Sequence, residues 1–118
     1  MFARMTILYV KAENIDDAIR LFRTSVVPEA KKQEGYRGTC LLVDRAAGQG
    51  RVVTFWRSEK DILATEENRY YQEQLVKVIP YLSGPMMRES YEVVVHAMSE
   101  PEPKKLKKPK TPKRKSRK

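Results

Sequence analysis

Two kinds of apolar periodicity alternate along this chain, and their order limits the folds that it can adopt. Residues 2–11 have the β-branched and apolar content of a strand. Residues 15–26 then repeat apolar side chains at helical spacing, with Asn14 as the expected N-cap. Pro28 predicts a bend or a break in this helix, because proline lacks the backbone N–H and crowds the preceding turn. Gly35 marks its C-terminal end.

The middle of the chain carries the pattern of a β-hairpin. Residues 36–44 and 52–57 are β-prone runs, and the segment between them, residues 45–50, contains two glycines that permit a tight turn. Ser58 follows as the expected N-cap of a second helix that begins at about Glu59. A hairpin between two helices is therefore expected.

The second helix and the segment after it complete the pattern. Its apolar stripe continues to Pro80, and the polar stretch at residues 65–69 predicts a bend within it. Residues 89–98 form a further strand-like run. The order βαββαβ predicts an α+β domain of the ferredoxin-like type, with a four-stranded antiparallel sheet and both helices on one face.

Strand alternation divides the sheet into two faces, and one of them is expected to lie beneath the helices. The more apolar set is assigned to the covered face: Met5, Ile7, Tyr9, Val53, Phe55, Tyr91, Val93 and Val95. The opposite face then carries a mixed set: Arg4, Thr6, Leu8, Val10, Thr54, Trp56, Glu92, Val94 and His96. This set exposes too much apolar surface for a monomer, so we expect a homodimer that pairs two sheets and leaves room for a small-molecule ligand.

Several side chains of the mixed face are candidates for chemistry. His96, the only histidine, suits proton transfer near neutral pH, although a structural strand histidine is the alternative. Arg4 and Glu92 either pair across adjacent strands or clamp a polar substrate. Trp56 either stacks on a flat ligand or anchors packing. The expected cavity lining comprises these residues and others: Arg4, Thr6, Thr54, Trp56, Asn68, Tyr70 and Glu92. No spacing typical of a metal or cofactor site is present, so neither is expected.

Cysteine content and hydropathy place the chain in a cellular context. Cys40 is the only cysteine, which rules out an intrachain disulfide and favours a reducing compartment. Arg4 interrupts the apolar N-terminal run, so a signal peptide is not expected. No apolar segment approaches the length of a transmembrane helix. A cytoplasmic location is expected.

The charge is concentrated in the last residues. The formal net charge is +9, yet ten of the 24 basic residues lie beyond Pro103, which leaves 14 basic against 15 acidic residues in residues 1–103. We therefore divide the chain into a domain at 1–100 and a disordered, Lys- and Pro-rich tail at 101–118. The tail is either solvated or contacts nucleic acid or an acidic membrane surface without sequence specificity. Its candidate contacts are Lys104, Lys105, Lys107, Lys108, Lys110, Lys113, Arg114, Lys115, Arg117 and Lys118.

Short segments across residues 2–98 resemble the antibiotic biosynthesis monooxygenase-like domains of the dimeric α/β-barrel superfamily. They are Gly35-Tyr36-Arg37-Gly38, Leu42-Val43-Asp44-Arg45, Trp56-Arg57-Ser58-Glu59-Lys60-Asp61 and Tyr91-Glu92-Val93. The resemblance implies a barrel formed across a dimer, a cavity in each protomer and, in enzymatic members, oxygen-dependent oxidation without metal or flavin. Haem-degrading members use an Asn on strand one and a Trp and a His on helix two, all absent here, which argues against haem degradation. The alternative function is that of a non-enzymatic dimer which binds nucleic acid through its tails.

Overall fold

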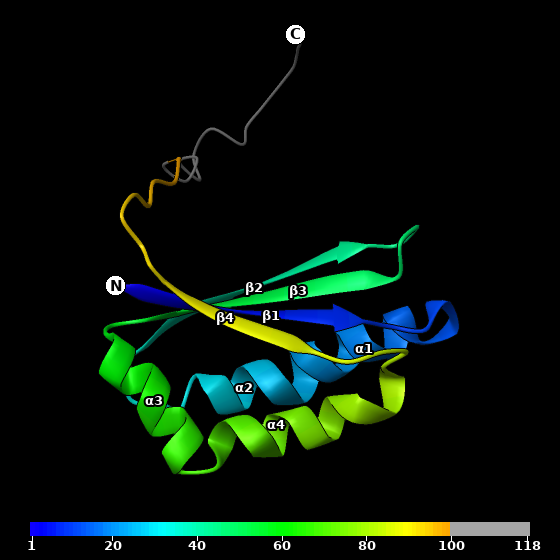
Figure 1. The fold of residues 1–118 in the computed structure, drawn as a ribbon, viewed down its shortest axis with the longest axis horizontal. Helices are drawn as coiled ribbons and strands as arrows, with labels where there is room; N and C mark the ends of the chain where they lie inside the picture. The colour runs from blue at the N-terminus through cyan, green and yellow to red at the C-terminus, as the bar shows by residue number, and fades with distance from the viewer. Residues whose placement is uncertain (100–118) are drawn as a thin grey trace, which may run out of the picture.

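The computed structural model describes residues 1–99, which form one sheet with helices on a single side (Figure 1). The predicted tail and its ten cationic contacts lie outside the described residues. The sheet order is β2-β3-β1-β4, and each neighbouring pair is antiparallel. This confirms the predicted ferredoxin-like plan. The strands are β1 (Phe2–Tyr9), β2 (Tyr36–Asp44), β3 (Gln49–Trp56) and β4 (Met87–Glu92).

The first helical segment is continuous through the predicted bend. It comprises a short 3₁₀ turn, an α-helix, a π-helical turn and a last α-helical turn: η1 (Ala12–Asn14), α1 (Ile15–Leu21), η2 (Phe22–Val26) and α2 (Val27–Ala30). Asn14 stands at the N-cap of α1, but its side chain makes no capping hydrogen bond. Val27 N–H donates to the carbonyl of Phe22, five residues earlier, just before Pro28. The wider turn accommodates the proline without breaking the helix.

The second helical segment has the predicted bend. It consists of α3 (Glu59–Glu67), α4 (Tyr70–Val78) and the 3₁₀ turn η3 (Ile79–Tyr81). Ser58 caps α3, because its Oγ accepts the backbone N–H of Asp61 at 3.2 Å. The chain breaks at Arg69, which has a φ of 71°, and the Asn68 side chain then accepts the N–H of Tyr70 at 2.9 Å. This second cap explains how α4 starts again at once.

The last strand is shorter at its C-terminal end than the predicted segment 89–98. It begins two residues earlier, at Met87, and ends at Glu92. Its partner β1 starts at Phe2, and the N–H of Val93 already donates to the carbonyl of Met1 at 2.9 Å. Beyond that bond the neighbouring strand offers no further backbone partner. The apolar residues that follow therefore leave the sheet, with Val94 and Val95 more than 80% exposed.

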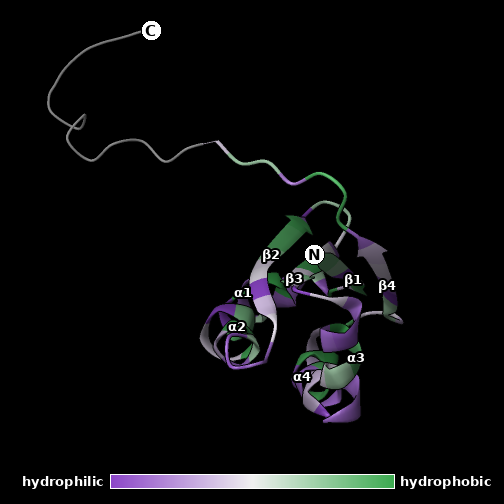
Figure 2. Cartoon of the chain, turned by 90° about the vertical axis from the view of Figure 1, so that its left-hand side faces the viewer, coloured by the Kyte–Doolittle hydropathy of each residue, from purple (hydrophilic) through white to green (hydrophobic). Residues whose placement is uncertain are grey.

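The prediction of which sheet face lies beneath the helices is wrong. The covered face carries Arg4, Thr6 and Leu8 of β1, all less than 9% exposed, with Val52 and Trp56 of β3. The more apolar row lies on the open side. Figure 2 shows both helical segments on one side of the sheet. Both faces are apolar enough to be buried, and a prediction from hydropathy alone places the more apolar face beneath the helices. What decides the outcome is that the helices supply polar partners for Arg4 and Thr6.

The hydrophobic core lies between the sheet and the helices. It contains buried side chains from both helical segments and from β1 and β3: Leu8, Phe22, Val26, Val52 and Val78. Within residues 1–99, no helix combines the length and the hydropathy that crossing a membrane requires.

Candidate functional site

A small cavity lies between the covered face of the sheet and the two helical segments. Its volume is about 50 Å³. The lining residues come from β1, β3, η2 and α4: Arg4, Thr6, Leu8, Phe22, Val26, Val52, Thr54, Tyr70, Tyr71, Gln74, Leu75 and Val78. Most of the wall is apolar or aromatic, and Arg4 is the only charged residue in it. A guanidinium in such a wall is the feature that most needs an explanation, because a buried charge is costly unless it is paired.

Arg4 lies on the central strand β1 and is 3% exposed. Its Nη1 donates to Thr65 Oγ1 at 2.9 Å and approaches Glu66 Oε2 at 3.5 Å. The guanidinium carbon stands 4.0 Å from the centre of the Tyr71 ring and 5.6 Å from that of Trp56. Burial lowers the pKa of Arg4 from its ordinary value, while Tyr71 and Glu66 act in the opposite direction. Arginine nevertheless stays charged, so the cavity has one positively charged wall.

Trp56 packs against Arg4 within the layer between the sheet and the helices. Its side chain is fully buried, and its Nε1 donates to Thr54 Oγ1 at 2.9 Å. The ring also packs edge to face against Tyr36, with 5.8 Å between centroids. Trp56 is not among the cavity-lining residues, so it packs beneath Arg4 as an anchor and does not face the empty space.

Two tyrosines at the start of α4 face the cavity in different ways. The hydroxyl of Tyr71 is 3.0 Å from Thr6 Oγ1, which satisfies both groups. Tyr70 is 8% exposed, and among residues 1–99 its hydroxyl has no hydrogen-bond partner. Burial raises the pKa of Tyr70 to about 12. The Tyr70 hydroxyl is therefore protonated near neutral pH and available to a ligand.

The raised pKa of Tyr70 predicts a loss of stability in alkali. Its neutral form is favoured in the folded state, so its contribution is complete below pH 10 and is lost as the pH rises toward about 12. We expect the free energy of unfolding of Tyr70→Phe to fall less between pH 9 and pH 11.5 than that of the wild type. Urea unfolding at the two pH values measures this, with Tyr9→Phe on the surface as the control. Equal losses in all three proteins would contradict the assignment.

The structure brings some of the predicted cavity residues together and separates others. Arg4, Thr6, Thr54 and Tyr70 line one cavity. Asn68 is exposed at the helix break, where its side chain caps α4. Glu92 is exposed and lies opposite Phe2, so the predicted pairing with Arg4 is wrong. The carboxylate beside Arg4 is that of Glu66, because Arg4 points into the layer between sheet and helices.

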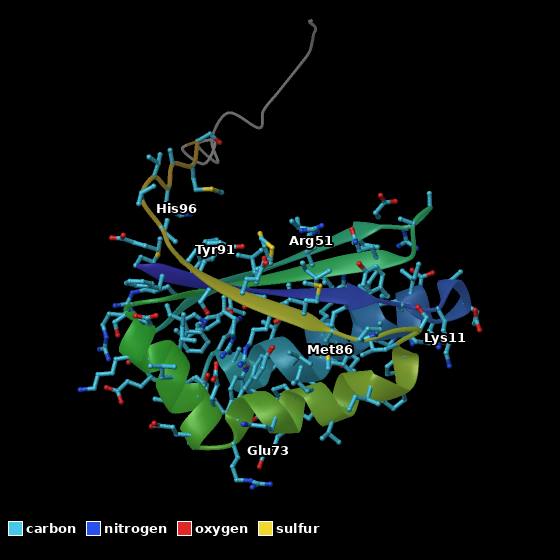
Figure 3. All side chains as sticks on the ribbon, in the orientation of Figure 1. Lys11, Arg51, Glu73, Met86, Tyr91 and His96 are labelled. Carbon is cyan, nitrogen blue, oxygen red and sulfur yellow. The ribbon has the colours of Figure 1, made fainter. Side chains whose placement is uncertain are left out.

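His96 lies away from this cavity. It follows the end of β4, is exposed, and its ring is 5.4 Å from that of Phe55, measured between centroids. Phe55 alternates with the buried Trp56 and belongs to the open face. Figure 3 shows His96 and Tyr91 on the side of the sheet opposite the helices. Within one protomer, His96 and Arg4 are thus on different faces.

Sequence reasoning missed the polar residues that the helices and β4 contribute. Thr65, Glu66 and Gln74 come from α3 and α4, and Arg88 comes from β4. Thr65 and Gln74 are buried polar residues within the apolar stripe of helix two, at helical spacing from Ile62 and Tyr71. A polar residue inside an apolar stripe was the available signal.

Metal-ligating side chains are dispersed in the described part of the chain. No three His, Cys, Asp or Glu residues among positions 1–99 gather closely enough to hold a metal ion.

Solved structures with the same fold come from several organisms. A protein of unknown function from Nitrosomonas europaea is 18% identical, with a TM-score of 0.65 over 85% of this chain and 95% of that one. Rv0793 from Mycobacterium tuberculosis is 14% identical, with a TM-score of 0.64 over 82% and 98%. The monooxygenase from the gene ActVA-Orf6 of Streptomyces coelicolor, solved with the ligand nanaomycin D, is 12% identical, with a TM-score of 0.65 over 84% and 92%. At these low identities, the TM-scores establish a shared fold.

Sequence comparison assigns the family. A search of curated proteins finds no match. The sequence profile described as antibiotic biosynthesis monooxygenase matches residues 1–74, a span that includes β1, both halves of the hairpin, α3 and the first residues of α4. Arg4, Thr54, Tyr70 and Tyr71 all lie within that span. The chain therefore belongs to the antibiotic biosynthesis monooxygenase family.

Proposed function

We propose that the cavity beside Arg4 binds a small aromatic or polyphenolic compound and that the protein oxidises it with molecular oxygen, without a cofactor. The observation that carries this proposal is the buried guanidinium of Arg4, which faces a cavity walled by Phe22, Tyr70 and Tyr71. Family membership supports the monooxygenase class, and a protein of the same fold has been solved with nanaomycin D. A buried cation between aromatic rings suits an aromatic substrate that carries negative charge.

Oxidation of a polyphenol by molecular oxygen requires few specific catalytic residues from the protein. A deprotonated polyphenol is electron-rich enough to react with oxygen, so the site has to favour the anion, orient the ring and exclude water. Arg4 supplies the positive charge, and the Tyr70 hydroxyl supplies a hydrogen-bond donor. The apolar wall, including Val26, Val52 and Val78, keeps water out.

The size of the cavity sets a condition on binding. About 50 Å³ holds only a few water molecules, so an aromatic ring enters only if the lining moves. The helix break at Arg69 leaves α4 joined to α3 by a non-helical link. Because α4 carries Tyr70, Tyr71 and Gln74, a shift of α4 away from the sheet would enlarge the cavity. We therefore expect ligand binding to displace α4.

Oxygen consumption with a panel of quinols and polyphenols tests the proposed activity. Arg4→Met keeps the apolar stem and removes the charge, and we expect it to lower kcat/KM by about 100-fold, as loss of a preorganised charge does. Arg23→Met, on the exposed face of η2, is the matched control and should be fully active. His96→Ala tests the predicted base separately. Full activity in Arg4→Met would refute this site assignment, and mass spectrometry of a co-purified ligand would identify the compound.

The same proposal includes a homodimer in which two open sheet faces meet. The open face carries Leu42, Met87 and Tyr91, each more than half exposed. They lie on the two edge strands β2 and β4, so the open face exposes large apolar side chains across its width, as is typical of a covered surface. A second copy of the chain covers both faces at once.

A further inference from the structure

Arg4 shares its carboxylate partner with a second arginine. Glu66 Oε2 lies 3.5 Å from Arg4 Nη1 and 3.4 Å from Arg88 Nη1. The guanidinium carbon of Arg88 also lies 5.2 Å from the centre of the Tyr71 ring, and the Arg88 side chain is more exposed than that of Arg4. Two guanidinium groups therefore meet a single carboxylate, and the cluster retains a net positive charge. Because both contacts are long for charged hydrogen bonds, Glu66 satisfies neither cation fully.

The hydrogen-bond donors of Arg4 are largely unused. A guanidinium has five N–H groups. Among residues 1–99, Arg4 donates only through Nη1, to Thr65 and Glu66, and its Nε and Nη2 have no protein acceptor. Buried donors without partners cost free energy, so they mark a place where an acceptor is expected.

A second unused group lies in the same cavity. The Tyr70 side chain lines the cavity and is more than nine-tenths buried, and its hydroxyl has no partner within the described residues. No Asp or Glu lines the cavity. The space therefore offers an incoming molecule a charged donor and a neutral donor, set among aromatic and aliphatic walls.

From this arrangement we propose that the cavity binds an aromatic carboxylate, and that Glu66 competes with the carboxylate of the ligand for Arg4. The free N–H groups of Arg4 and the Tyr70 hydroxyl hold the two oxygens, since a planar guanidinium matches a carboxylate in geometry. The aromatic part lies among Phe22, Tyr70 and the aliphatic lining. When the ligand binds, Glu66 keeps Arg88 as its partner. The inference rests on the proposed function, because it uses the same cavity, and it names the charge class of the ligand.

Salicylate and salicylamide provide the test, because they have nearly the same shape and differ in charge. We expect calorimetric titration to show salicylate bound at least about 10-fold more tightly, the value of one charge-assisted hydrogen bond. Glu66→Gln removes the competitor without changing its size, so it should tighten salicylate by a further factor of about 10 and leave salicylamide unchanged. Glu67→Gln, the exposed neighbour on α3, should change neither.

Two further variants exclude a purely structural effect. Tyr70→Phe should weaken salicylate more than salicylamide, because a carboxylate accepts a hydrogen bond from the hydroxyl more strongly than an amide carbonyl does. In Arg88→Gln, Arg4 is the remaining arginine partner of Glu66, so Glu66 should compete more strongly with the ligand. This variant should therefore weaken salicylate binding, whereas Glu66→Gln should tighten it. If salicylamide binds as tightly as salicylate, or if Glu66→Gln fails to separate them, the carboxylate site is refuted. Oxidation of quinols with no salicylate binding would refute this inference alone, whereas charge-selective salicylate binding without oxidation of any quinol would refute the proposed oxygenase.

Discussion

Replacing Gly35 by alanine is expected to lower the free energy of unfolding by about 4 kcal/mol, a large part of the stability of a domain of this size. Gly35 has a φ of 83°, in the left-handed region that side chains disfavour. A Cβ at this position would overlap Cγ of Asp61 and lie 2.8 Å from its Cβ. Backbone strain accounts for roughly 1–3 kcal/mol, and displacement of Asp61 adds to it.

Asp61 cannot move aside without losing several bonds. Its carboxylate accepts from Arg57 Nε at 2.9 Å and Arg57 Nη2 at 2.8 Å, and from Ser58 Oγ at 2.9 Å. The hydrogen bond from Arg57 also lowers the pKa of Asp61. Gly35 in turn accepts the N–H of Arg57 at 2.8 Å. The end of the first helical segment, the end of β3 and the start of α3 are thus fastened at one point.

A matched glycine separates these effects from a general cost of added bulk. Gly84 has no positive φ, and a Cβ there would make an ordinary contact of 3.7 Å with Tyr9. We expect Gly84→Ala to change stability by less than about 1 kcal/mol. Urea unfolding followed by circular dichroism measures both variants. Equal, small effects at the two positions would show that Asp61 yields easily and that this junction is not a strong structural constraint.

The order of elements could be predicted because each one has its own local signal. The spacing of Ile15, Ala18 and Phe22 indicates a helix, and Ser58 indicates the start of the next one. The end of β4 could not be predicted from its own residues, since residues 93–98 are as β-prone as the strand itself. A strand ends where its partner ends, and here the partner β1 starts at Phe2.

The residues of the candidate site could be predicted only in part from the sequence. Alternation along the strands grouped Arg4, Thr6 and Thr54 on one face, and they do line one cavity. Alternation does not say which face the helices cover. Arg4 appears unsuited to burial until its partners Thr65 and Glu66 are placed, and those lie more than 60 residues away. Long-range partners of a buried charge follow only from the packed structure.

The open face of the sheet is the one that was predicted to lie beneath the helices, and its composition favours a dimer. The sequence assigned the mixed row of the sheet to the open side, whereas the more apolar row is open. Leu42 on β2 is 53% exposed there, and Met87 on β4 is 52% exposed. Two copies that joined these faces would remove the exposed apolar side chains from water, and this removal favours association. The observed face therefore gives a stronger reason for a homodimer than the predicted one.

Leu42→Glu is accordingly expected to convert the proposed dimer into a monomer. A two-fold interface contains each substitution twice, so the substitution places two carboxylates in an apolar contact. Leu63→Glu is the matched control, since Leu63 is 51% exposed but lies on α3, on the helical side of the sheet. Sedimentation equilibrium of both variants at micromolar concentration, with circular dichroism to verify folding, should give a monomer for Leu42→Glu and a dimer for Leu63→Glu. A monomeric wild type, or a Leu42→Glu protein that remains dimeric, would refute association through the open face.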